Sequence, residues 1–176
     1  QIGLSNIGPK RLMKLINFLA KRDQHLKSVQ IQFSLLAPDL GKQYQVKKIC
    51  DENNIDFFAY SPLSFGILCI DPDKEENKEK SFIRNSLFEN YKKPTYELRR
   101  CLKRIAHQRS VSQAQVAINW CCYQGTIPLV GMRKKSQVID VSNVFNWNLN
   151  KNEFKVLQEV SKKCLKKMPK NPFSSN

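Results

Sequence analysis

The 176 residues of this chain suffice for one domain with a sizeable core, and a composition of 41% hydrophobic and 10% aromatic residues is typical of globular proteins. No apolar run approaches the ~20 residues that a membrane-spanning helix needs, so the sequence excludes a membrane protein. Lys and Arg total 30 against 15 Asp and Glu, and the resulting net charge of +15 only weakly indicates a polyanionic partner; nucleic acid is not the expected one.

Four short apolar runs predict β-strands, and a helical pattern follows each of them. The runs cover residues 2–5, 29–33, 55–60 and 126–131. Strands that alternate with helices are typical of a parallel sheet. The sequence therefore predicts an α/β protein built from about four β/α units.

The helices are predicted from apolar residues at helical spacing and from capping residues. Pro9 suits the first turn of a helix, Ser112 can cap another, and Asn150 followed by Glu153 is typical of a capping box. The predicted helices lie near residues 9–19, 44–54, 98–106, 112–125, 136–144 and 150–164.

Two stretches lack the pattern of packed elements. Residues 71–93 are predicted to form a variable surface loop, because 71–81 carry Asp-Pro-Asp and a mixed-charge run with few apolar residues. Residues 162–176 form a basic tail that we expect to fray. Neither stretch is interpreted as a domain boundary, so residues 1–176 are expected to form one unit.

The six cysteines include no Cys-x-x-Cys pair, and no His-x(3–5)-His pair occurs. The sequence therefore predicts no metal site and no redox motif. Free thiols favour a reducing compartment, for which we expect the cytoplasm and leave an organelle open. The segment from Gln1 to Asn6 has neither the basic start nor the apolar stretch of a signal peptide, and we interpret the chain as a piece of a longer protein.

The carboxyl ends of parallel strands meet at one edge of the sheet, where ligands of β/α proteins bind. Ser5, Asn6 and Gln30 lie at the ends of the first two strands and can offer an amide group a donor and an acceptor side by side. Tyr60 ends the third strand and offers a flat heteroaromatic ring a stacking face. These side chains suit the nicotinamide end of a dinucleotide.

Phosphate-binding features follow the third and fourth strands. Gly66 allows the backbone to approach a pyrophosphate, and beyond Gly131 the side chains of Arg133 and Lys134 can neutralise a phosphate monoester. The strand ends together therefore predict a nicotinamide dinucleotide in its phosphorylated form, NADPH. They carry no Ser-His-Asp or Cys-His order and no paired carboxylates, so the strand ends predict neither a nucleophilic triad nor a carboxylate pair.

Three segments stand in order along the chain: Ile-Gly-Leu-Ser-Asn (2–6), Val-Gln-Ile-Gln-Phe-Ser-Leu-Leu (29–36) and Ala-Tyr-Ser-Pro-Leu-Ser-Phe-Gly-Ile-Leu (59–68). A Gln-Val-Ala-x-x-Trp helix (115–120) and a Pro-x-x-Gly strand (128–131) follow. As a series, these motifs resemble the second half of an aldo-keto reductase. The resemblance implies a (β/α)8 barrel of the TIM type, of which this chain is the carboxyl-terminal half, and NADPH-dependent reduction of aldehydes and ketones.

The resemblance also implies a role for each matching residue. Ser5, Asn6 and Gln30 would hold the nicotinamide carboxamide, and Tyr60 would stack on its ring. The residues expected to bind the pyrophosphate are Ser61, Leu63 and Gly66. Those in the segment expected to bind the adenosine 2′-phosphate and the adenine are Arg133, Lys134, Gln137 and Asp140. Val141 departs from the family pattern, which commonly has an adenine-contacting Asn there.

The general acid of the family, a Tyr with Asp, Lys and His partners, is expected on strands that this chain lacks. The chain alone is therefore expected to be inactive, and its exposed edge strands are expected to need either the missing half of the barrel or self-association. The expected partner of the complete protein is a small carbonyl substrate. Two alternatives stay open: a non-catalytic barrel that senses the cofactor, and a basic module that binds polyanions through residues 133–135 and the tail.

Overall fold

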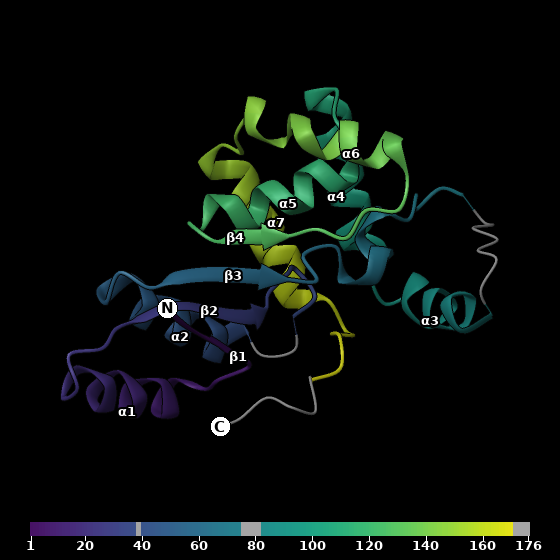
Figure 1. Cartoon of the computed structure of the whole chain (residues 1–176). Helices are drawn as coiled ribbons and strands as arrows, with labels where there is room; N and C mark the ends of the chain where they lie inside the picture. Colours follow the sequence, from purple (N-terminus) through teal and green to yellow (C-terminus); the bar gives the residue numbers. More distant parts are fainter. Residues whose placement is uncertain (38–39, 75–81, 171–176) are drawn as a thin grey trace.

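The computed structural model describes residues 1–37, 40–74 and 82–170 and contains a sheet of four parallel strands flanked by helices (Figure 1). The strands lie across the sheet in the order in which they occur in the chain. They are β1 (Ile2–Ser5), β2 (Leu26–Gln32), β3 (Asp56–Tyr60) and β4 (Ile127–Leu129). The four predicted strands and the α/β class are confirmed.

Helices connect the strands, as parallel pairing requires. The α-helices are α1 (Pro9–Ala20), α2 (Leu40–Glu52), α3 (Phe82–Lys92), α4 (Tyr96–Arg109), α5 (Gln113–Tyr123), α6 (Lys135–Ser142) and α7 (Lys151–Lys163). Two 3₁₀ helices, η1 (Ser64–Cys69) and η2 (Asn143–Asn146), complete the described elements. Among these helices, none combines the length and the apolar character that crossing a bilayer requires.

The predicted capping residues behave as their sequence positions indicate. The Ser112 hydroxyl accepts a hydrogen bond from the backbone N–H of Gln115 at 3.1 Å, which caps the start of α5. Asn150 and Glu153 form the reciprocal pair of a capping box at the start of α7, at 2.9 and 2.8 Å. Local sequence therefore sets where these two helices begin.

The two faces of the sheet have different surroundings. One face packs against the helices and buries alternate strand residues, such as Val29 and Phe57, in a core that includes Trp120. On the opposite face, the described residues leave a hollow of about 350 Å³. The hollow is lined by Gly3, Leu4, Ser5, Ser28, Gln30, Phe58 and Leu129.

The prediction of a surface loop over residues 71–93 is wrong in its second half. The chain forms α3 there, and Phe88 and Tyr91, three residues apart on one helix face, are buried in the core. The helix was not predicted because its apolar pattern is short and directly follows a polar, mixed-charge run. Residues 75–81, which carry most of the mixed-charge run, lie outside the described residues.

The prediction that the basic tail frays is wrong for residues 164–170. Met168 is only 2% exposed, and its backbone N–H donates to the carbonyl of Leu36 at 2.8 Å. The Lys167 amine donates to carbonyls of Ser161 and Leu35, and burial lowers the pKa of Lys167. Long-range packing thus holds this segment, whereas residues 171–176 lie outside the described part of the chain.

Candidate functional site

The structure brings Ser5, Asn6, Gln30 and Tyr60 together at the carboxyl ends of the strands. The Tyr60 hydroxyl donates to Asn6 Oδ1 at 2.7 Å, and Asn6 Nδ2 donates to Ser5 Oγ at 2.9 Å. The backbone N–H of Asn6 donates to the carbonyl of Gln30 at 2.9 Å. Ser5 and Gln30 are also paired across β1 and β2, and both line the open hollow. Four residues predicted to bind nicotinamide therefore share one surface.

Left-handed backbone conformations gather at the same edge of the sheet. Their φ angles are 57° at Asn6, 54° at Ser61, 49° at Ser64, 58° at Phe65 and 96° at Gly66. Each non-glycine residue in this region costs about 1–3 kcal/mol, and such strain concentrates at functional sites. The remaining left-handed residues in the described part of the chain follow helix ends, where this conformation is ordinary; they are Asp23, Asn54, Ser110 and Gly125.

The residues predicted to bind pyrophosphate lie in the turn after β3, at Ser61 and Leu63, and within η1, at Gly66. The start of η1 is fixed by a buried hydrogen bond of 2.9 Å between the hydroxyls of Ser34 and Ser64. Gly66 follows with the positive φ that only glycine adopts without steric cost. Ile67 and Leu68 are fully buried and anchor the turn on the core. The sequence therefore folds here into a turn that is packed on the core at the carboxyl end of β3.

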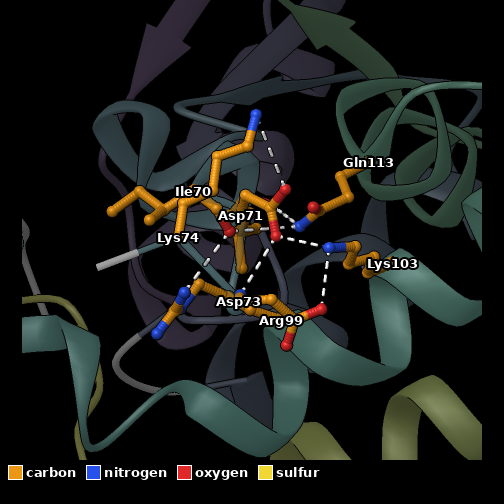
Figure 2. A network of polar contacts seen from close by, with 8 residues as sticks. Ile70, Asp71, Asp73, Lys74, Arg99, Lys103 and Gln113 are labelled. Carbon is orange, nitrogen blue, oxygen red and sulfur yellow. Dashed lines mark hydrogen bonds and ion pairs between the residues drawn. The ribbon is translucent and has the colours of Figure 1, made fainter. Parts of the chain in front are cut away.

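A buried arginine holds the segment that leaves η1 (Figure 2). Arg99 of α4 is 3% exposed, and its guanidinium donates to the carbonyls of Ile70 at 3.3 Å and Lys92 at 2.6 Å. The Gln113 amide of α5 donates to the carbonyls of Leu68 at 3.2 Å and Ile70 at 3.4 Å. These donors satisfy carbonyls at the end of η1 and tie it to two helices.

Lys103 of α4 completes this network with two ion pairs. Its amine lies 2.6 Å from Asp71 Oδ1 and 2.8 Å from Asp73 Oδ2, and both contacts are visible in Figure 2. The hydrogen bond from Lys103 lowers the pKa of the Asp71 carboxyl below its ordinary value. Sequence reasoning missed Arg99, Lys103 and Gln113, because their contacts with Leu68, Ile70 and Asp71 cross about 30 to 45 residues and no local spacing indicates them.

The predicted phosphate-binding segment leaves β4 at the same edge of the sheet, since Tyr60 of β3 pairs with Leu129 of β4. A Cβ atom added at Gly131 would meet nothing within 4 Å, so no neighbour in the described chain requires a glycine there. Arg133 and Lys134 follow with exposed side chains. This segment thus presents open space and two exposed cations beyond the carboxyl end of β4.

Gln137 and Asp140 differ from these two cations, because their polar groups bind other parts of the chain. Gln137 Oε1 accepts from the backbone N–H groups of Arg133 at 2.8 Å and Lys134 at 3.1 Å. The Asp140 carboxylate accepts from Ser112 Oγ at 2.6 Å and from Gln115 Nε2 at 2.7 Å. Both residues therefore shape the segment that presents the cations.

Comparisons with known proteins agree on one family. The family model described as "Aldo/keto reductase family" matches residues 1–162. The chain is 36% identical over 175 residues to the chloroplastic pyridoxal reductase of Arabidopsis thaliana, and this match covers 99% of the chain and 47% of the Arabidopsis protein. It is 24% identical over 160 residues to an NADPH-dependent alpha-keto amide reductase of Saccharomyces cerevisiae, and this match covers 90% of the chain and 43% of the yeast protein.

A solved structure shows the same fold. A thermostable aldo-keto reductase in complex with the inhibitor epalrestat superposes with a TM-score of 0.66 at 18% identity, which covers 90% of this chain and 47% of that chain. The chain thus spans about half the length of the relatives it matches.

Proposed function

Because the chain belongs to the aldo/keto reductase family, we propose that it supplies the cofactor-binding half of a complete (β/α)8 barrel that reduces aldehydes and ketones with NADPH. The observation that carries this proposal is the hydrogen-bonded group of Ser5, Asn6 and Tyr60 at the edge from which Arg133 and Lys134 also extend. An aromatic face, amide-binding groups and cations are the three recognition elements of a phosphorylated nicotinamide dinucleotide.

The chemistry of the strand ends fits NADPH. The Tyr60 hydroxyl is held by Asn6, which fixes the ring that is proposed to stack on the nicotinamide. Ser5 and Gln30 line the hollow at the same end of the sheet, and their side chains are proposed to bind the carboxamide. The positive φ of Gly66 and the open space at Gly131 leave the backbone accessible to the phosphate groups. Arg133 and Lys134 are proposed to neutralise the 2′-phosphate.

NADPH, when bound, supplies the hydride that reduces the carbonyl carbon. This chain orients the cofactor, whereas the proton for the carbonyl oxygen is proposed to come from the other half of the barrel. Tyr60 is not assigned that role, because its hydroxyl donates to Asn6 Oδ1 inside the nicotinamide-binding group. The proposed division places cofactor binding and proton donation on different halves.

The substrate is proposed to be a small aldehyde or ketone. Pyridoxal is the first aldehyde to test, because the Arabidopsis relative is named a pyridoxal reductase. The proposed compartment is reducing, the cytoplasm or an organelle, because all six cysteines are free thiols.

The test is NADPH oxidation by the complete protein with pyridoxal and a panel of aldehydes and ketones, with the 176-residue chain assayed alongside. We expect turnover by the complete protein and none by the chain. Turnover by the chain alone would contradict the division of roles between the halves. NADPH binding by the complete protein without reduction of any carbonyl would favour the cofactor sensor, and salt-sensitive binding to many polyanions without dinucleotide preference would favour the basic module.

A further inference from the structure

Helix α6 carries the predicted 2′-phosphate segment at its amino end, yet none of its side chains is buried in the described chain. Two of its three apolar residues, Val138 and Ile139, are 49% and 56% exposed, and the third, Val141, is only partly buried. Figure 1 shows α6 beyond β4 and beside α5. Because burial of an apolar face normally holds a helix in place, another interaction must position α6 against the rest of this chain.

Asp140 provides that interaction. Its Oδ2 accepts from Ser112 Oγ at 2.6 Å and its Oδ1 from Gln115 Nε2 at 2.7 Å, so both carboxylate oxygens bind α5 or its cap. Ser112 is the N-cap of α5, which places the negative charge at the amino end of that helix, where the helix dipole stabilises it. Hydrogen bonds to an ionised carboxylate are among the stronger ones in proteins.

Ser112 and Gln115, which donate hydrogen bonds to Asp140, are held in place by other contacts. Gln115 is 5% exposed, and its Oε1 accepts from Trp147 Nε1 at 3.1 Å. Its backbone N–H donates to Ser112 Oγ, so one hydroxyl caps α5 and also binds Asp140. The connection therefore runs from η2 and Trp147 through α5 into α6.

In the first turn of α6, Gln137 connects the helix to the segment that bears the two cations. Its Oε1 accepts from the backbone N–H groups of both Arg133 and Lys134, so the backbone that bears these side chains is tied to the first turn of the helix. A displacement of α6 would consequently move both cations.

We propose that Asp140 is a positioning residue, which together with Ser112 and Gln115 fixes α6 and thereby sets the preference for NADPH over NADH. This inference rests on the proposed function, since it assumes that Arg133 and Lys134 face the 2′-phosphate. It differs from the expected contact between Asp140 and the adenine, because the Asp140 carboxylate is already bound on both oxygens.

The two roles predict different binding data. NADPH and NADH share the adenine and differ in the 2′-phosphate, so loss of an adenine contact weakens both, whereas misplaced cations weaken NADPH alone. Calorimetric titration of the complete protein with each dinucleotide separates them. We expect Asp140→Asn and Gln115→Met to weaken NADPH binding by about tenfold, which is about 1.4 kcal/mol, and to leave NADH binding within about twofold.

Two control variants separate positioning from general destabilisation. Ser112→Thr keeps the hydroxyl and is expected to retain the NADPH preference. Ser112→Ala removes the hydroxyl and is expected to lose that preference. Asn150→Ala removes the equivalent cap of α7 and is expected to lower thermal stability without changing either affinity.

Equal weakening of NADPH and NADH in Asp140→Asn and Gln115→Met would overturn the inference, as would an unchanged preference in both. Those outcomes leave the proposed function intact as long as the unaltered protein prefers NADPH. If the unaltered complete protein binds neither dinucleotide, the proposed function fails and the inference fails with it.

Discussion

Asn6 illustrates how a single residue connects the ends of two strands. Its backbone takes the left-handed conformation that Asn tolerates better than most residues, and its side chain accepts from Tyr60 and donates to Ser5. A left-handed residue directly after a strand turns the chain sharply, so the side chain can reach across to the end of β3. The conformation and the hydrogen bonds together orient the Tyr60 ring.

Substitutions at Tyr60 test whether this ring binds the cofactor. Tyr60→Leu in the complete protein is expected to weaken NADPH binding by tenfold or more, because stacking on a base contributes about 1–3 kcal/mol. Tyr60→Phe retains the ring and is expected to bind within about threefold of the unaltered protein. Fluorescence titration with NADPH measures both, and unchanged affinity in Tyr60→Leu would contradict the stacking role.

Glu153 gives a prediction at low pH. Burial raises the pKa of Glu153, but two hydrogen bonds from Arg109, at 2.8 and 2.9 Å, and one from the backbone of Asn150 outweigh it, so the net shift is downward. A carboxyl with a lowered folded pKa stabilises the folded state above its ordinary pKa of 4.5, and that contribution is lost as pH falls through the folded pKa.

The variant Glu153→Gln cannot lose this contribution, because it does not titrate. Between about pH 5 and pH 3, its free energy of unfolding is expected to fall less than that of the unaltered protein, by about 0.5–1 kcal/mol given the partial exposure of Arg109. Urea unfolding at several pH values measures the difference. Parallel pH profiles of the two proteins would show that the pair contributes nothing.

At the scale of elements, sequence predicts what is encoded locally. The strands follow from short apolar runs, and α5 and α7 follow from the caps at Ser112 and Asn150. The packing of residues 164–170 depends on contacts with the chain near Leu36, more than 120 residues earlier, and no local pattern reveals it. For the same reason the sequence placed Asp140 in the candidate site but did not reveal its bonds to α5.

The packed C-terminal segment predicts a specific loss of stability. Met168→Ala removes a side chain that is 2% exposed and is expected to lower the free energy of unfolding by about 2–4 kcal/mol. Leu165→Ala, three residues away at 93% exposure, is the matched control and is expected to change it by less than about 0.5 kcal/mol. Similar small effects in the two variants would mean that the segment does not pack in solution.

At the scale of the whole molecule, the main feature is a parallel sheet in which no described strand pairs with the outer edges of β1 and β4, and one face of which carries an open hollow. Large apolar side chains are exposed on α1, the helix that follows β1, at Met13 and Phe18, and on the edge strand β4, at Ile127 and Leu129. Parallel sheets are normally covered on both faces, and an unpaired edge strand is a template for association. The four strands therefore form an incomplete structural unit when the chain is alone.

We expect the isolated 176-residue chain to self-associate for this reason. Sedimentation velocity should show oligomers, and coexpression with the other half of the proposed barrel should replace them with a stoichiometric complex, because that half covers the open edges and face. A monodisperse monomer of the isolated chain, stable over a range of concentrations, would contradict this view.

The most direct test of the account is a crystal structure of the complete protein with NADPH. We predict the nicotinamide ring stacked on Tyr60 with its carboxamide near Ser5, Asn6 and Gln30, and the 2′-phosphate against Arg133 and Lys134. A dinucleotide bound away from the carboxyl ends of these strands, or contacts with only one of the two groups of residues, would contradict the claim that they form a single NADPH site.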